Sequence, residues 1–220
     1  MGNIFTSSIG KKLIMSISGL FLMIFLVVHL IANGTSLISP EAFEAACEFM
    51  SMPLIKIMVP VLAAGFVIHI IYAGYLTITN LKARGNERYA VSHTGKSDSW
   101  AAKNMFVLGI IVLGFLAFHL THFWAKMQLP EFLGQEAEDP NMLMEQIFGS
   151  LYFTIAYIVW FIALWFHLSH GFWSAFQTLG ANNSIWIKRW QVVAQVYATV
   201  VVAGFIIIAL NAYLKANGII

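Results

Sequence analysis

The sequence predicts an all-α fold: a single membrane-embedded bundle of five transmembrane helices that takes up residues 1–220. Composition is the first indication, because 60% of the residues are hydrophobic and only 10% are charged, far from the usage of soluble proteins. The second is the distribution of these residues. The apolar ones gather in five segments long enough to cross a bilayer, and the charged ones lie between the segments.

The first apolar segment, at 13–33, carries no charge and would span roughly 30 Å as a helix, the thickness of the hydrocarbon core. Its apolar core is too long for a secretory signal and no small-x-small cleavage pattern follows, so we expect this helix to be retained. The other four transmembrane helices are expected at about 57–80, 104–126, 150–177 and 191–214.

Two short helices are expected along the membrane surface between these spans. In the loop 34–56, Ser39 precedes Pro40, a typical helix start. Helical spacing then places four less polar residues on one face: Phe43, Ala46, Cys47 and Met50. The stretch MLMEQIFG at the end of the loop 127–149 predicts a second short helix.

The basic residues predict the orientation. Of the 12 Lys and Arg residues, nine lie at the N-terminus or in the expected loops 81–103 and 178–190: Lys11, Lys12, Lys82, Arg84, Arg88, Lys96, Lys103, Lys188 and Arg189. The other side has Lys56, Lys126 and Lys215, with eight of the ten carboxylates. By the positive-inside rule, the N-terminus is then cytoplasmic and the C-terminus lies outside.

Two classes of function are excluded by composition. The net charge of +2 and the scattered basic residues do not fit nucleic-acid binding. Cys47 is the single cysteine, so the chain cannot build an intramolecular disulfide, a zinc cluster or an iron–sulfur site from cysteine.

Histidines are the main candidates for function. Six of the seven lie in the expected spans: His29, His69, His119, His122, His167 and His170. His93 lies in a polar loop and is most simply a solvated residue. One histidine in a membrane helix is often only a packing or interface residue, but six across four consecutive helices are hard to explain in that way.

The depth of these histidines in the membrane predicts pairs. At the helical rise per residue, His29 and His119 lie roughly 24 and 22 Å above the inner ends of their helices. His69 and His167 lie roughly 18 and 25 Å below the outer ends of theirs. Two histidines at one level can ligate a six-coordinate haem b, one on each face of the iron. Two levels therefore predict two haems stacked across the membrane.

Two further histidines compete for the ligand positions. His122 and His170 each lie three residues after a preferred candidate, on nearly the same helix face. They could instead hydrogen-bond a haem propionate or line a quinone pocket, so spacing leaves the choice open. Small residues could make room for a haem, although close helix packing explains each of them equally well: Ser16, Gly19, Gly65, Gly74, Gly109, Gly114 and Gly171.

Five stretches in order along the chain carry a resemblance: IFLVVHLIAN, EAFEAACEFM, HIIYAGYLTITN, GIIVLGFLAFHLTHFW and FHLSHGFWSAF. The chain resembles the five-helix, dihaem cytochrome b membrane anchor of succinate:quinone oxidoreductases (succinate dehydrogenase and fumarate reductase). The resemblance implies that His29 and His119 hold the outer haem, and that His69 and His167 hold the inner one. In the expected helix at 150–177, the family's pattern H-x-x-x-G-x-W selects His167 over His170.

The resemblance also implies cofactors and partners. The cofactors would be two haem b and a quinone, menaquinone in preference to ubiquinone. The partners would be a flavoprotein and an iron–sulfur subunit, at the cytoplasmic face of a bacterial inner membrane. The chain would then carry the quinone-reactive site of the enzyme complex, without dicarboxylate chemistry of its own. Glu44 and Glu48 are candidates for quinone-linked proton transfer. Some members have a proton-conducting glutamate where this chain has Trp165, which puts that proton route in doubt.

Two other functions stay open at this point. The chain could be the dihaem cytochrome b of another respiratory complex, such as a hydrogenase or formate dehydrogenase, in which the ligands would be distributed differently among the helices. It could also be a histidine-lined transporter or channel, which would bind no haem. Transporters often show inverted repeats, and we find none in this sequence.

Overall fold

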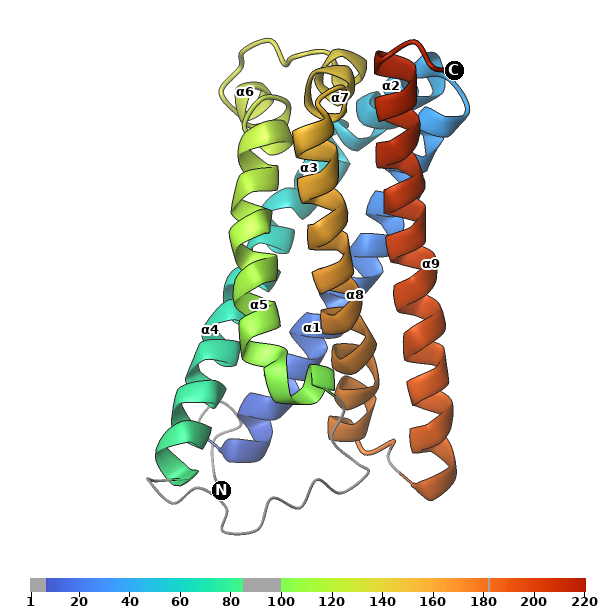
Figure 1. Cartoon of the computed structure of the whole chain (residues 1–220). Coiled ribbons are helices and arrows are strands. Elements are labelled where there is room, and N and C mark those ends of the chain that lie inside the picture. The colour runs from blue at the N-terminus through green and yellow to red at the C-terminus, as the bar shows by residue number, and fades with distance from the viewer. Residues whose placement is uncertain (1–6, 85–99, 182) are drawn as a thin grey trace.

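The structure, a computed structural model, describes residues 7–84, 100–181 and 183–220, and every element in that part of the chain is helical. Five elements form the long helices of the bundle: α1 (Ser8–Gly34), α4 (Met58–Arg84), α5 (Trp100–His119), α8 (Leu151–Thr178) and α9 (Ser184–Ala216) (Figure 1). Each belongs to a helical segment long and apolar enough to cross a membrane. The predicted fold class, an all-α membrane bundle, is confirmed.

Short helices gather at one end of the bundle, together with the C-terminus, whereas α1 begins at the opposite end (Figure 1). They are η1 (Thr35–Leu37), α2 (Pro40–Met50), α3 (Pro53–Lys56), the π-helix η2 (Leu120–Trp124), α6 (Gln128–Phe132) and α7 (Pro140–Phe148). With Glu41 and Glu145 in α2 and α7, and Glu131 in α6, this end holds all the carboxylates of the described residues. The two ends of the bundle therefore differ strongly in charge.

Both expected short helices are present. In α2, the hydroxyl of Ser39 accepts a hydrogen bond from the backbone N–H of Ala42 at 3.2 Å, and Phe43 is buried as expected. In α7, the carboxylate of Asp139 caps the helix in the same way, by accepting from the N–H of Met142. Four side chains of α7 are buried, so this helix belongs to the core instead of lying only along the surface: Leu143, Met144, Ile147 and Phe148.

Two long helices begin earlier than hydropathy predicts, because side chains cap them. The hydroxyl of Ser7 accepts from the N–H of Gly10 at 3.0 Å, and α1 starts at Ser8 instead of residue 13. The side chain of Asn183 accepts from the N–H groups of Ile185 and Trp186, and α9 starts at Ser184 instead of residue 191. The expected loop 178–190 is therefore wrong in its second half.

This correction changes where the basic residues lie. Lys188 and Arg189 belong to the first turns of α9, Lys82 and Arg84 to the end of α4, and Lys103 to the start of α5. Charged residues at helix ends can extend into the interface without breaking the helix. Arg88, His93 and Lys96 lie outside the described residues.

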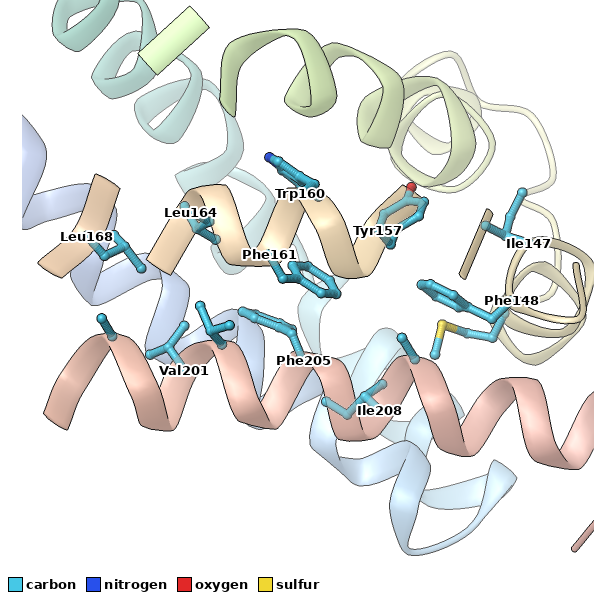
Figure 2. Close-up of a cluster of buried hydrophobic side chains, with 14 of the residues drawn as sticks. Ile147, Phe148, Tyr157, Trp160, Phe161, Leu164, Leu168, Val201, Phe205 and Ile208 are labelled. Atoms are coloured by element: carbon cyan, nitrogen blue, oxygen red, sulfur yellow. The ribbon is translucent and has the colours of Figure 1, made fainter. Parts of the chain in front are cut away.

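The main hydrophobic core lies between α8 and α9 and is closed at one end by α7 (Figure 2). Figure 2 shows that Phe161 and Leu164 of α8 point toward α9, where Phe161 stacks on Phe205 with ring centroids 5.6 Å apart. Trp160 points the other way, toward α5, and stacks on Phe115 at 5.8 Å. The aromatic residues of α8 therefore fix the positions of both neighbouring helices.

The helices α4 and α5 lie on the outside of this core. α4 packs on α1, and α5 packs on α8, while α1 also contacts α8 and α9. Only 6% of an 18-residue apolar stretch is buried in α4, and the same share in α5. In α9 the corresponding share is 39%. Such apolar, uncovered surfaces are what lipid chains cover in a membrane protein.

Candidate functional site

The outer histidine pair joins α1 to α5. The imidazole rings of His29 and His119 lie with their centroids 5.8 Å apart and nearly perpendicular, at 88°. Phe25 stacks on His29 at 5.3 Å, and Phe205 of α9 lies 5.7 Å from the same ring. On the other side, Trp160 lies 5.8 Å from His119. Three helices, α1, α8 and α9, therefore supply these aromatic side chains around the outer pair.

The inner histidine pair joins α4 to α8. The ring centroids of His69 and His167 are 6.4 Å apart, and the rings meet at 73°. Two glycines border this pair. A Cβ atom added to Gly19 would lie 3.2 Å from Cε1 of His69, and one added to Gly109 would lie 3.8 Å from Cε1 of His167. Backbone at these two positions comes close to the imidazoles because it has no side chain.

A serine hydroxyl lies beside the ring of His69. The hydroxyl of Ser18 donates to the carbonyl oxygen of Met15 at 3.0 Å, and its oxygen lies 3.3 Å from Nδ1 of His69. This arrangement favours the tautomer in which Nδ1 carries the proton and donates it to the hydroxyl oxygen. His69 then keeps a free lone pair on Nε2, which is the form that binds a metal ion. At His29, the amide nitrogen of Asn33 is 3.5 Å from Nδ1, too long to fix the tautomer.

The spacing of both pairs fits a metal ion held between two imidazoles. With metal–nitrogen bonds of about 2.0 Å on opposite faces, the two ring centroids would be roughly 6 Å apart. In the part of the chain that the structure describes, no group of three or more His, Cys, Asp or Glu side chains could hold a metal by itself. Each pair offers two nitrogen ligands, so the remaining ligands would come from a bound group, as the ring nitrogens of a porphyrin do.

Buried nitrogens support the same interpretation. Nδ1 of His119 and Nδ1 of His167 are buried and have no hydrogen-bond partner within the described residues. A buried polar group without a partner is costly, and such groups gather at functional sites. The residues present therefore fit haem as the bound group.

His122 does not lie in the outer pair. It belongs to the π-helix η2, and its Nδ1 lies 3.1 Å from the hydroxyl of Tyr157, on which its ring stacks at 6.0 Å. π-helices are rare and frequently occur at functional sites. Spacing left His119 and His122 as alternatives, and the structure places the ring of His119 against His29.

His170 lies one turn from the inner pair, toward the end of the bundle where α1 begins. Its ring packs edge-on against Trp173 of the same helix, with centroids 5.0 Å apart. The ring that faces His69 is that of His167. The residue that the pattern H-x-x-x-G-x-W indicates, His167, is therefore the one whose ring faces His69.

Two of the other glycines serve helix packing. A Cβ atom on Gly65 would overlap the ring of Phe21, and one on Gly171 would contact Met23. Around Gly74 and Gly114, nothing described lies within 4 Å of such an atom. Of the six glycines expected to make room for a haem, only Gly19 and Gly109 border an imidazole; Ser16 is simply buried.

The two carboxylate candidates lie away from the core. Glu44 and Glu48 are exposed on the outer side of α2. In the same helix, burial raises the pKa of the Cys47 thiol to about 11, and the nearby carboxylates of Asp139, Glu131 and Glu44 add to the effect. The free thiol therefore stays protonated near neutral pH.

Two groups of residues were missed from the sequence. Tyr157 is buried between His122 and His119, with its ring centroid 6.2 Å from that of His119. It precedes His167 by ten residues, about 15 Å along a helix, so the depth argument could have placed it at the outer level. The second group is an ion pair between Lys56 and Glu131 at 2.8 Å, to which Ser51 donates a hydrogen bond.

Comparisons of the chain with protein-family models, with curated proteins and with solved structures find no match. The site is therefore interpreted from its own residues and geometry.

Proposed function

We propose that this chain is the dihaem cytochrome b membrane anchor of a succinate:quinone oxidoreductase. In this role it passes electrons between an iron–sulfur subunit and a membrane quinone. One observation carries the proposal: two histidine pairs, His29 with His119 and His69 with His167, lie at two levels of the bundle with spacings that suit axial ligation. The resemblance of the sequence to this family supports the choice of complex.

The residues of the chain have distinct tasks in this proposal. The two pairs would hold one haem b each, and such a haem would supply a reversible one-electron couple. Ser18 keeps Nε2 of His69 available as a ligand. The aromatic side chains around His29 and His119 exclude water from the outer pair.

The two ends of the bundle suit different partners. The end with α2, α6 and α7 carries the described carboxylates, and the other end carries Lys11, Lys12 and Lys103. By the positive-inside rule the basic end is cytoplasmic, in a bacterial inner membrane, and there it would dock the iron–sulfur and flavoprotein subunits. The quinone, menaquinone by resemblance, would react near the outer pair.

The pair of His122 and Tyr157 supports a quinone site at the outer end. The two polar groups hydrogen-bond to each other beside His119, and His122 is half-buried, so it reaches the outer surface. A histidine in this position can exchange protons with the solvent side. Glu44 and Glu48 are farther toward solvent and would only receive such protons.

A spectrum of the purified chain tests the proposal. We expect the dithionite-reduced minus oxidised spectrum, with haem quantified per polypeptide, to give two b-type haems. His29→Ala and His69→Ala should each remove a different one, because each deletes one axial ligand. His122→Ala is the matched control and should retain both haems, since His122 pairs with Tyr157 and not with a second ligand histidine.

The other results are equally informative. A chain without haem, after expression with ample haem supply, would exclude the cytochrome and favour a histidine-lined transporter. Two haems of which His29→Ala removes neither would indicate the different ligand distribution of another respiratory cytochrome b. Copurification of flavin and iron–sulfur clusters with the chain would identify the complex.

A further inference from the structure

A cavity of about 330 Å³ opens between the first turns of α1 and the last turns of α4. The ends of α1 and α4 that line it lie opposite the short helices of the bundle (Figure 1). None of the four paired histidines lines it. Its polar lining residues are Ser8, Lys11, Lys12, Tyr75, Thr79 and Asn80. Two positive charges thus meet hydroxyl and amide groups in one hollow.

The geometry of Lys11 holds its charge at this cavity. Its ammonium group donates a hydrogen bond to the hydroxyl of Tyr75 at 2.8 Å and lies 4.2 Å from the centroid of that ring. An ammonium has three protons to donate, so two remain for a ligand. The Tyr75 hydroxyl accepts from Lys11 and keeps its own proton to donate.

The two lysines have no carboxylate partner within the described residues. Both ion pairs of that part of the chain, Lys56 with Glu131 and Lys126 with Glu138, lie at the other end of the bundle. The carboxylates in α2, α6 and α7, and in the loop between α6 and α7, lie there too. Among the described residues, nothing negatively charged faces the two lysines, and their charge favours an anionic ligand.

Apolar side chains surround the same end of the two helices. Ile9 of α1 is 81% exposed, and Ile78 and Leu81 of α4 are 53% and 59% exposed. Both helices are apolar enough to cross a membrane, so these side chains would meet lipid chains. A ligand that joins an anionic group to long hydrocarbon chains matches this surface better than a free anion does.

We propose that this cavity binds the phosphate of an anionic phospholipid. Lys11 and Lys12 neutralise the phosphate, the Tyr75 hydroxyl and the Asn80 side chain add hydrogen bonds, and the acyl chains run along α1 and α4. The recognised group is a negatively charged phosphate, either free or as the diester of a phospholipid. The exposed apolar side chains beside the cavity favour the phospholipid. The site does not depend on the histidine pairs or on haem.

The experiment measures lipid selectivity of the full chain in nanodiscs with spin-labelled lipids. We expect phosphatidylglycerol to be held in preference to phosphatidylcholine. The double variant Lys11→Gln with Lys12→Gln should weaken the binding of phosphatidylglycerol roughly 10- to 30-fold and leave that of phosphatidylcholine unchanged. Lys103→Gln, an exposed lysine of α5 that does not line the cavity, is the matched control and should keep the preference.

Tyr75→Phe guards against a folding artefact. It keeps both charges and removes one hydroxyl, so the preference should fall by only a fewfold. Equal selectivity in the wild type and the double variant overturns the proposal, as does an equal loss in Lys103→Gln, which would mean diffuse attraction. If millimolar inorganic phosphate displaces the spin-labelled lipid at constant ionic strength, the ligand is the free anion, and the proposal of a phospholipid is overturned.

Discussion

At the scale of single residues, the inner histidine pair is defined by what surrounds it. Gly19 lets the backbone of α1 approach the ring of His69, and Ser18 beside it orients the same ring. Two adjacent residues of α1 therefore position a histidine of α4. From the sequence, Gly19 was one of several small residues that could make room for a haem, because spacing alone does not say which way a helix face is turned.

Gly19→Leu tests this contact. Because a Cβ atom there would already lie 3.2 Å from Cε1 of His69, the larger side chain must displace the imidazole. We expect the variant to lose the inner haem and keep the outer one, so that haem per polypeptide falls by about half. Leucine is a good helix former, so the helix itself is not weakened.

Gly74→Leu is the matched control for this prediction. Nothing described lies within 4 Å of a Cβ atom at Gly74, so the same substitution should leave both haems in place. Equal haem content in the two variants would mean that Gly19 does not support a ligand histidine.

At the scale of elements, the sequence predicts which helices exist better than where they begin. The apolar segments are long, so the five spans follow from length and hydropathy alone. The start of α9 depends on a local contact, the cap formed by Asn183, and a window over apolar residues does not detect it. The π-helix η2, whose His122 lies within hydrogen-bond distance of Tyr157 in α8, is indicated by no local pattern in LTHFW.

Tyr157→Phe tests the contact between the π-helix and α8, because Tyr157 is the partner of His122 in η2. Tyr157 is only 1% exposed, and its hydroxyl lies 3.1 Å from Nδ1 of His122. Removing the hydroxyl deletes this hydrogen bond while the ring still fills its space, so we expect a loss of about 1 kcal/mol in the free energy of unfolding. Unfolding by a denaturing detergent, followed by circular dichroism, measures it.

Tyr152→Phe on the same helix is the control. Its side chain is 75% exposed, so the expected change is below about 0.5 kcal/mol. If the two variants are equally stable, the hydrogen bond between Tyr157 and His122 does not hold the π-helix to α8.

At the scale of the whole molecule, the histidine pairing followed from geometry that every helix shares. The rise per residue is fixed, so the depths of His29 and His119 could be compared without knowing how the helices pack. The structure brings their rings together, and it does the same for His69 and His167. Which side of a helix faces which neighbouring helix depends instead on packing between helices that are distant in the sequence. For this reason the roles of His122 and Gly65 could not be predicted.

The number of spans gives the last prediction. Five crossings put the two ends of the chain on opposite sides, and α1 begins at one end of the bundle while the C-terminus lies at the other (Figure 1). With the basic end in the cytoplasm, alkaline phosphatase fused after Ile220 should be active, because that enzyme folds only outside the cytoplasm. Green fluorescent protein fused after Gly180, four crossings from the start, should fluoresce, because it folds inside. The reverse pair of results would invert the orientation. An active phosphatase after Ile220 together with a dark fluorescent protein after Gly180 would contradict the crossing of α9.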